Sequence, residues 1–244
     1  MRRLIISFLS TGTAAALMAG GIFITAPTPA TADGMTAKQA QMLVRGGKLY
    51  DNWPSVIGVR PKGTHKSWPA TNTKKKGSAT HRCKSCHGWD YMGKDGAYAS
   101  GSYKTGIIGV RALANGDQAK IIGVLGDSTH GYGGVIPPAD MQAIALFVAK
   151  GQVDMNPYID RAAKKPKGDI GRGGVYYATV CSNCHGMDGM KPKDMKSFGK
   201  QMGNPWEVMH KILNGHPGED MPSLRAFDPQ VAADIMTHMA TLPK

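Results

Sequence analysis

The pattern C-x-x-C-H occurs twice in this chain, and no other feature limits the possible folds as strongly. It stands at residues 83–87 and 181–185 and uses all four cysteines of the 244-residue sequence. No cysteine is left over for a structural disulfide. A thioredoxin-type redox pair needs neither the histidine nor a second copy. Two C-x-x-C pairs that share a zinc ion are about 15–20 residues apart, whereas Cys86 and Cys181 are separated by 95.

The motif is typical of covalent heme attachment. Its two thiols bond to the two vinyl groups of heme, and the adjacent imidazole lies under the iron as proximal ligand. The sequence therefore predicts two covalently attached heme c groups. The predicted attachment residues are Cys83, Cys86, Cys181 and Cys184, and the predicted proximal ligands are His87 and His185.

An internal repeat precedes the two motifs. Gly46-Gly47-Lys48-Leu49-Tyr50 matches Gly173-Gly174-Val175-Tyr176-Tyr177, each on a predicted helix. Tyr177 lies four residues before Cys181, about one helical turn, but Tyr50 lies 33 residues before Cys83. Residues of about 54–82 are therefore predicted to be an insertion. They are rich in Pro, Gly, Thr and Lys, which favours a loop.

Each copy also ends in an amphipathic pattern. Helices are predicted to begin at Pro138 and at Pro229, the second capped by Asp228, because apolar residues follow at i, i+3, i+4 and i+7. The predicted inward residues are Met141, Ile144, Ala145 and Val148 in the first helix, and Ala232, Ile235, Met236 and Met239 in the second. No convincing strand pattern is present. The fold class is predicted to be mainly α, with one domain over 33–165 and a second over 166–244, joined by the polar segment 164–171.

The first residues are predicted to be a signal peptide over 1–32. Arg2 and Arg3 form a positive start, an apolar stretch runs from Leu4 to about Thr25, and Ala30-Thr31-Ala32 resembles a cleavage site. We expect cleavage near Ala32, a mature chain that starts near Asp33, and a periplasmic protein. An uncleaved membrane anchor is the alternative. The arginine pair is a weak twin-arginine signal, because the rest of that motif is missing.

The charge is strongly basic, with a formal net charge of +13. Removal of residues 1–32 takes away two arginines and leaves 28 basic against 17 acidic residues, or +11. A basic balance often indicates nucleic acid, but an exported protein does not meet it. An acidic redox partner or an anionic membrane surface fits better. No later stretch is long and apolar enough to span a membrane.

The segment from Gly173 to Gly186, G-x-x-x-Y-x-x-x-C-x-x-C-H-G, resembles the start of a bacterial class I cytochrome c. Met221-Pro222 resembles the distal methionine loop of that family. The resemblance covers residues 173–242 well and 46–150 more loosely. It implies two tandem cytochrome c-like helical domains, each around one covalently bound heme, and a periplasmic electron carrier or electron-entry module.

The sixth iron ligand is predicted from the same alignment. Met221 is the candidate in the second copy and lies eight residues before Pro229. The residue eight positions before Pro138 is His130, which is therefore the predicted distal ligand of the first heme. The rivals at the first heme are His65, His81, Met92 and Met141, of which Met141 is the weakest because its helical spacing indicates core packing.

Three functions remain open on the sequence. Electron transfer between redox proteins is the leading interpretation, because iron with two protein ligands changes charge with little rearrangement. The second is an oxidoreductase acting on a sulfur compound or peroxide at the first heme, which would need an open distal face. The known sulfur-oxidising type uses a distal cysteine, and none is spare here. The third is a subunit of a larger oxidoreductase complex. A carrier is favoured over an enzyme.

Overall fold

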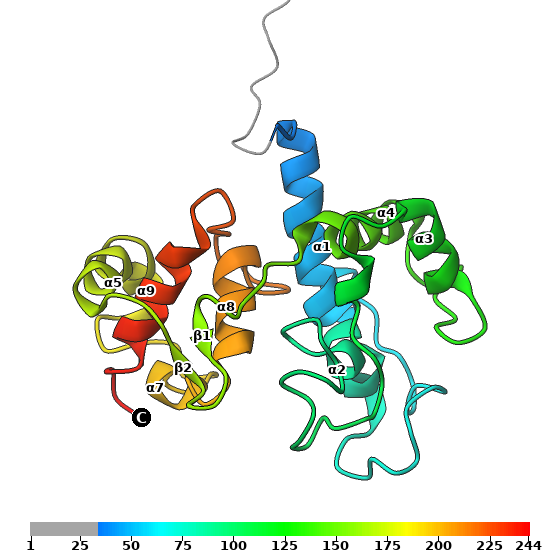
Figure 1. Ribbon diagram of the computed structural model, residues 1–244, viewed down its shortest axis with the longest axis horizontal. Helices are drawn as coiled ribbons and strands as arrows, with labels where there is room; N and C mark the ends of the chain where they lie inside the picture. The colour runs from blue at the N-terminus through cyan, green and yellow to red at the C-terminus, as the bar shows by residue number, and fades with distance from the viewer. Residues whose placement is uncertain (1–33) are drawn as a thin grey trace, which may run out of the picture.

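The computed structural model describes residues 34–244, so the predicted signal peptide lies outside the described residues. This part of the chain is mainly helical, as predicted (Figure 1). Helices α1–α4 lie together on one side of the picture and α5–α9 on the other. We call residues 34–165 the first half and residues 166–244 the second half. Among residues 34–244, no helix has the length and apolar character needed to cross a membrane.

The main elements follow one another in a similar order in both halves. In the first half they are α1 (Ala37–Val56), α2 (Cys83–His87), α3 (Gln118–Gly126) and α4 (Pro138–Leu146), which continues into a π-helical turn, Phe147–Gly151. In the second half they are α5 (Ile170–Tyr176), a π-helical turn (Tyr177–Cys181), α6 (Ser182–His185), α7 (Phe198–Gln201), α8 (Pro205–Asn214) and α9 (Pro229–Met239). Both C-x-x-C-H motifs thus form short helices, and the helices predicted at Pro138 and Pro229 are confirmed.

The predicted loop is largely irregular. Helix α1 begins at a capping box in which Thr36 and Gln39 bond each other's backbone. It passes a non-helical residue at Asn52 and ends at Val56, slightly inside the segment predicted as an insertion. From there to the first motif, one 3-10 helix, Gly77–His81, is the only regular element.

A short hairpin lies near the predicted boundary between the halves. Strand β1 (Ile159–Asp160) pairs antiparallel with β2 (Lys165–Pro166), and Lys164 in the turn has a positive φ of 52°. The sequence showed no strand pattern because two-residue strands have no periodicity to detect. The domain boundary near residue 166 stays a prediction.

Each half is built on a close crossing of two helices. Helix α1 packs on α4, and α5 packs on α9. A Cβ at Gly46 would overlap the carbonyl oxygen of Ala143, and one at Gly173 would overlap that of Asp234. Only glycine lets the two backbones approach so closely. Ala143 and Asp234 each lie five residues after the proline that opens their helix, so the crossings share the register that the sequence alignment used.

An ion pair supports each crossing, from the residue directly before the glycine. Arg45 bonds the buried Asp140 with its Nε and Nη2 atoms, the latter 3.0 Å from Oδ2. Arg172 Nε lies 2.8 Å from Oδ2 of the buried Asp234. The charge-assisted hydrogen bonds from the guanidinium offset the free-energy cost of burying the carboxylate.

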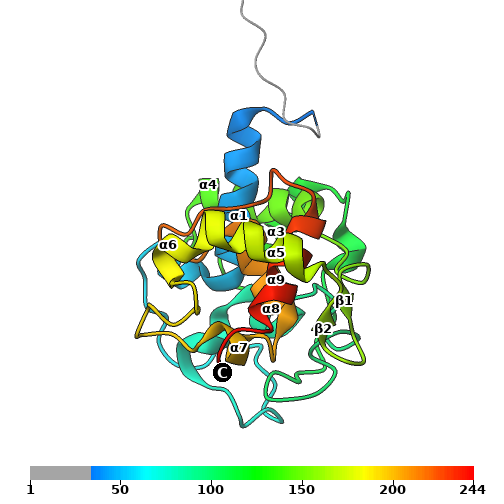
Figure 2. The same ribbon diagram turned by 90° about the vertical axis from the view of Figure 1, so that its left-hand side faces the viewer.

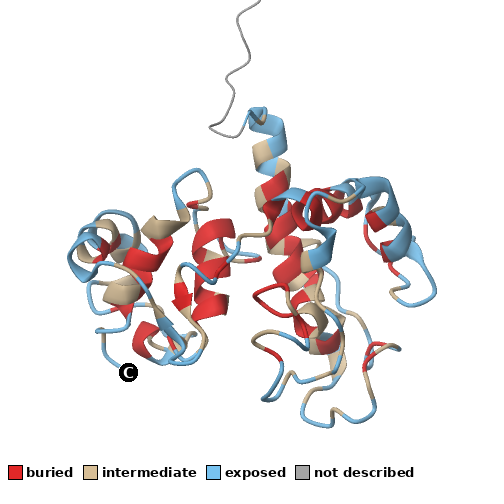
Figure 3. Ribbon diagram, in the orientation of Figure 1, coloured by how far each residue is buried: buried red, intermediate tan, exposed pale blue. Residues whose placement is uncertain are grey.

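The buried residues follow the crossings (Figure 3). Both predicted inward faces are buried: Met141, Ile144, Ala145 and Val148 on α4 and its continuation, and Ala232, Ile235, Met236 and Met239 on α9. Aromatic side chains of both halves join the same cluster. The helical spacing therefore identified the core correctly.

Helix α8 joins the halves by packing against both α1 and α9. Figure 2, turned by 90°, shows α5 and α9 in front of α1. Asn214 of α8 lies against Gly47, where a Cβ would overlap its side chain. Lys211 Nζ lies 3.2 Å from Oδ2 of Asp51 in α1. The two halves therefore share a packed and partly charged interface.

Replacing either crossing glycine should destabilise the protein. Gly46→Ala or Gly173→Ala adds a methyl group where a backbone oxygen already stands, and overpacking of this kind costs about 1–3 kcal/mol of unfolding free energy. The measurement is denaturant unfolding of each variant. Gly123→Ala is the control, because nothing lies within 4 Å of its Cβ position. This helical substitution should be neutral or stabilising, and an equal loss in all three variants would contradict the crossing argument.

Candidate heme sites

Both motif helices end in the same way. A glycine with positive φ follows each histidine, Gly88 at 81° and Gly186 at 79°. Tyr50 donates its hydroxyl hydrogen bond to the Gly88 carbonyl over 2.7 Å, and Tyr177 donates to the Gly186 carbonyl over 2.6 Å. Each tyrosine lies one helical turn after its crossing glycine. The helix crossing therefore fixes the position of each C-x-x-C-H helix.

All four cysteines are free thiols within the described chain. Burial raises the pKa of Cys83 and of Cys86 to about 12, and the pKa of Cys181 to about 11. These thiols are thus neutral and unsuited to thiolate chemistry or metal binding. Residues 34–244 contain no cluster of three or more His, Cys, Asp or Glu side chains that could hold a metal ion. Neutral thiols beside a histidine suit attachment to heme vinyl groups.

The proximal candidate of the first half is held by a backbone carbonyl. His87 Nδ1 donates to the carbonyl of Ile108 over 2.8 Å, and burial lowers the pKa of His87. Its Nε2 is consequently the nitrogen available to a metal. A metal-binding histidine commonly donates its other ring N–H to such an acceptor, which fixes the tautomer.

The structure brings His87 and His130 together although 43 residues separate them. Their ring centroids are 6.2 Å apart and the ring planes are inclined by 23°. Because a metal–imidazole bond is about 2 Å long, two imidazoles on opposite sides of one metal have centroids roughly 6 Å apart. The centroid separation of the pair therefore matches that of two imidazoles that would hold one iron.

A carboxylate orients the second ring of the pair. Asp127 Oδ1 accepts from the backbone N–H groups of Thr129 and His130, at 2.8 and 2.9 Å, and lies 3.3 Å from His130 Nδ1. The hydrogen bond from the His130 N–H is the main cause that lowers the pKa of Asp127. With Nδ1 facing the carboxylate, Nε2 of His130 is left for a ligand. Asp127 was not predicted from the sequence, although its i, i+3 spacing to His130 is a turn signal.

The rivals at this site are engaged elsewhere. His65 Nε2 donates to the His130 carbonyl over 3.0 Å, and His81 Nε2 donates to the Gly63 carbonyl over 3.2 Å. The sulfur of Met92 lies 3.1 Å from a guanidinium nitrogen of Arg161. Met141 is buried in α4. Of the five candidates, His130 is the one whose ring is found beside that of His87, with 6.2 Å between the centroids.

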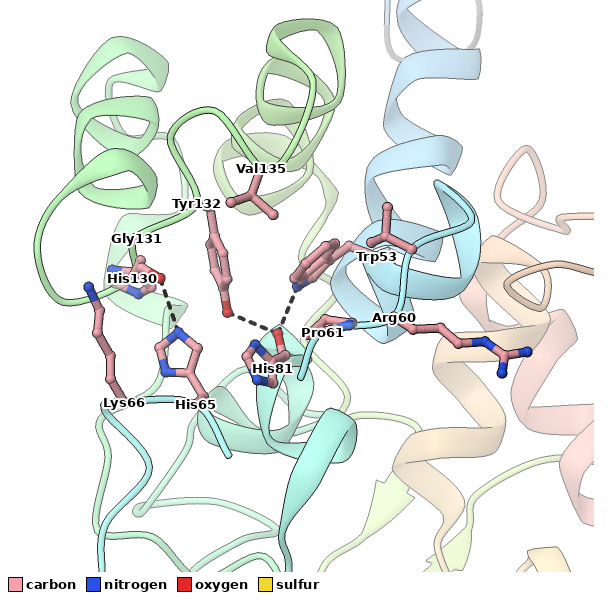
Figure 4. Close-up of a pocket in the computed structure, with 11 residues that line it drawn as sticks. Trp53, Arg60, Pro61, His65, Lys66, His81, His130, Gly131, Tyr132 and Val135 are labelled. Carbon is pink, nitrogen blue, oxygen red and sulfur yellow. Dashed lines mark hydrogen bonds between the residues drawn. The ribbon is translucent and has the colours of Figure 1, made fainter. Parts of the chain in front are cut away.

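A cavity of about 490 Å³ lies beside His130 (Figure 4). Trp53 Nε1 and the Tyr132 hydroxyl both donate to the carbonyl of His81, at 2.7 and 2.9 Å, and form its inner wall. Arg60 and Lys66 stand at its sides. The insertion thus contributes six of the eleven residues that line this open cavity at the predicted distal face.

The histidine of the second motif lacks the hydrogen bond that holds His87 in the first. His185 Nδ1 is buried and has no hydrogen-bond partner among the described residues, and its ring lies 4.6 Å from that of Phe198. Burial lowers the pKa of His185, and nearby His216 lowers it further. Met221 lies half-buried at the edge of the apolar core, in the loop between α8 and α9. His216 therefore joins Met221 as a candidate on the second distal loop.

Two further residues near the first motif were missed. Lys84, inside C-K-S-C, is buried with its ammonium 4.2 Å from the ring centroid of Trp89, and burial lowers its pKa to about 8. His210 of α8 is fully buried against Trp89 and Tyr91 of the first half. Trp89 and Tyr91 thus pack against the other half of the chain. Nothing local in the sequence signals either contact.

His210 is held as a neutral imidazole. Its Nε2 donates to the Gly47 carbonyl and its Nδ1 accepts from the Tyr91 hydroxyl, each over 3.0 Å. Both ring nitrogens are therefore used in linking α8 to the first half. Burial lowers the pKa of His210 to about 4.

A comparison with protein families supports the chemistry of the second half. Residues 168–239 match the family model described as Cytochrome C oxidase, cbb3-type, subunit III. This part of the chain is a cytochrome c domain, which implies covalently bound heme c and an electron-transfer protein. No curated protein and no solved structure matches the chain.

The neutral state of His210 should make stability depend on pH. Unfolded histidine titrates near 6.5, so between pH 6.5 and 4 the unfolded chain binds a proton that the folded chain does not. Unfolding free energy should fall as pH falls through this window, by on the order of 3 kcal/mol. Unfolding at pH 7 and pH 4 measures it.

His210→Gln should be less stable at pH 7 and should lose most of that pH dependence. His238→Gln is the matched control, because this histidine lies on α9 and is not fully buried. A His210→Gln variant with the pH dependence of the wild type would contradict the assignment.

Proposed function

We propose that this protein is an exported diheme c-type cytochrome that transfers electrons between redox proteins in the periplasm. A heme in the first half, in addition to the one in the second half, is proposed because both halves have the same frame. Gly46 and Gly173 cross their partner helices at the same register, and Tyr50 and Tyr177 make the same bond to the residue after each C-x-x-C-H. The first half therefore has the frame that holds the motif of the cytochrome c domain.

Heme c, bound at each motif, would supply an iron that exchanges single electrons. Cys83 and Cys86 would hold the first heme, and Cys181 and Cys184 the second. In the first half, His87 and His130 are proposed as axial ligands on the strength of the 6.2 Å between their ring centroids. Two fixed ligands limit rearrangement when the iron changes charge. That property suits a carrier.

In the second half, His185 and Met221 are proposed as axial ligands. The support is the register. Met221 lies eight residues before Pro229, as His130 lies eight residues before Pro138. The helix crossings at Ala143 and Asp234 each lie five residues after the same prolines, so they align in the same way. A thioether ligand raises the potential relative to a second imidazole. The second heme is thus proposed to be the high-potential one.

Export is proposed from residues 1–32 as a signal peptide cleaved near Ala32, with the mature chain starting near Asp33. The proposed partners are redox proteins with acidic surfaces, since the mature chain is basic. Nucleic acid is not among the proposed partners, because an exported chain does not meet it.

Two alternatives have a specific observation in their favour. The cavity beside His130 could admit a small substrate, which would suit an oxidoreductase acting on a sulfur compound or peroxide at the first heme. The family model describes a subunit of an oxidase, which would suit an electron-transfer subunit of a larger complex. The proposed His87–His130 ligand pair opposes the first alternative, because an iron held by two imidazoles would have no vacant side.

The proposal predicts two covalent hemes per chain. The protein made with working heme-attachment machinery should keep its colour after denaturation, and its mass should exceed residues 33–244 by two hemes. Cys83→Ala/Cys86→Ala should retain one heme. A wild-type protein with a single covalent heme would overturn the diheme proposal while leaving the cytochrome c domain at 168–239 intact.

The ligand pair of the first heme separates the carrier from the enzyme. Wild-type iron should be low-spin at both hemes and bind carbon monoxide poorly at neutral pH. His130→Ala should turn one heme high-spin and let it bind carbon monoxide, with the sulfur-to-iron band of the second heme retained. His81→Ala, in the same cavity wall, should leave the spin states unchanged. Carbon monoxide binding by the wild type would favour the oxidoreductase.

A further inference from the structure

Positive charge is concentrated in one part of the first half. Residues 52–89 contain eight Lys and Arg residues and no Asp or Glu. Residues 33–165 carry nineteen basic and nine acidic residues, whereas residues 166–244 carry nine and eight. Nearly all the net charge of the mature chain therefore belongs to the first half. Within that half, the insertion contributes basic residues and no acidic ones.

Two hydrogen bonds join the loops that carry these residues. The Gly77 N–H donates to Thr64 Oγ1 over 3.1 Å, and the Asn72 side chain donates to the Lys104 carbonyl over 2.9 Å. The loops that carry the cations are thereby tied to each other. We call the resulting surface the basic face, and its exposed cations are Arg60, Lys62, Lys66, Lys74, Lys76 and Lys104. Within residues 34–244, none of the six takes part in an ion pair.

The basic face adjoins the proposed site of the first heme. Arg60 and Lys66 line the cavity beside His130. Ser67 Oγ donates to the Thr129 carbonyl over 2.5 Å, and His65 Nε2 donates to that of His130. The insertion is therefore anchored on the loop of the predicted distal ligand, and a protein bound on this face would lie close to that heme.

We infer that the basic face is the docking surface for an acidic redox protein, and that electrons pass between that partner and the first heme. The inference rests on the proposed function and adds to it which half the partner meets. Five of the six unpaired cations lie within residues 52–89, which hold no acid, and the adjoining His130 loop adds the exposed carboxylate of Asp127. The basic face therefore carries a net positive potential, and such a potential raises association rates by about 10–10³. A partner with a negative surface would be both steered and oriented.

A membrane surface fits the basic face less well. Segments that lie on membranes combine basic residues with large apolar side chains that enter the lipid. Within residues 57–82, Val59 is the one large hydrophobic residue counted as exposed, at 38% of its surface. Trp68, the aromatic residue of the insertion, is buried. Val135 is the other exposed hydrophobic residue of the cavity wall, so two valines are the apolar surface beside the charge, and no exposed aromatic side chain among the lining residues joins them.

The test compares two triple variants of the heme-loaded protein that carry the same charge change. Lys62→Glu/Lys74→Glu/Lys76→Glu alters the basic face, and Lys193→Glu/Lys196→Glu/Lys200→Glu alters exposed lysines near the second motif. The probe is a labelled polyglutamate peptide at about 10 mM ionic strength, where the Debye length is about 30 Å. The basic-face variant should bind it about tenfold more weakly than the wild type, and the control should change less than about threefold.

A redox measurement ties the face to its heme. Ferricyanide is an anion and takes one electron from each reduced iron. Its reaction with the reduced protein should show a phase that slows about tenfold in the basic-face variant. Equal weakening by the two triples would overturn the inference. So would binding to phosphatidylglycerol vesicles without binding to polyglutamate. Because polyglutamate binding does not need heme, absence of the first heme would instead overturn the proposed function.

Discussion

The close contact between two helix backbones at a glycine is the constraint on which the rest of each half depends. At Gly46 and Gly173 a helix lies directly on the carbonyl of its partner helix. One turn further along the chain, Tyr50 and Tyr177 reach the carbonyl that follows a C-x-x-C-H histidine. A wider crossing would withdraw both hydroxyls from these carbonyls. The motif helices, which are too short to be stable alone, are thus positioned from the helix crossing.

Features with a local signal were predictable from the sequence. The motifs, the helices at Pro138 and Pro229, and their inward faces follow from spacing and periodicity. The contacts of His210 could not be predicted, since this residue bonds Gly47, 163 positions earlier in the chain. The burial of Lys84 could not be predicted either. A lysine in a short helix is expected in solvent, and only the tertiary packing of Trp89 buries it.

The insertion shows another limit of sequence reasoning. Its composition predicted a loop, and it is one, but its role depends on contacts with backbone carbonyls. His65 bonds the His130 carbonyl and Ser67 bonds the Thr129 carbonyl. Backbone acceptors exist at every residue, so no residue type along the chain marks these two as partners. The insertion therefore holds the predicted distal loop in a way that only the folded chain reveals.

The family model matches the second half and not the first, although the frame is common to both. The difference lies in two places: the long interval between Tyr50 and Cys83, and a histidine where the second half has Met221-Pro222. Both changes fall outside the helix crossing, so they leave the frame intact. In the proposed function both differences affect the first heme. A bis-histidine iron has the lower potential of the two, and it lies beside the basic face. Electrons delivered by an acidic partner would then enter at the low-potential heme and move downhill to the second half.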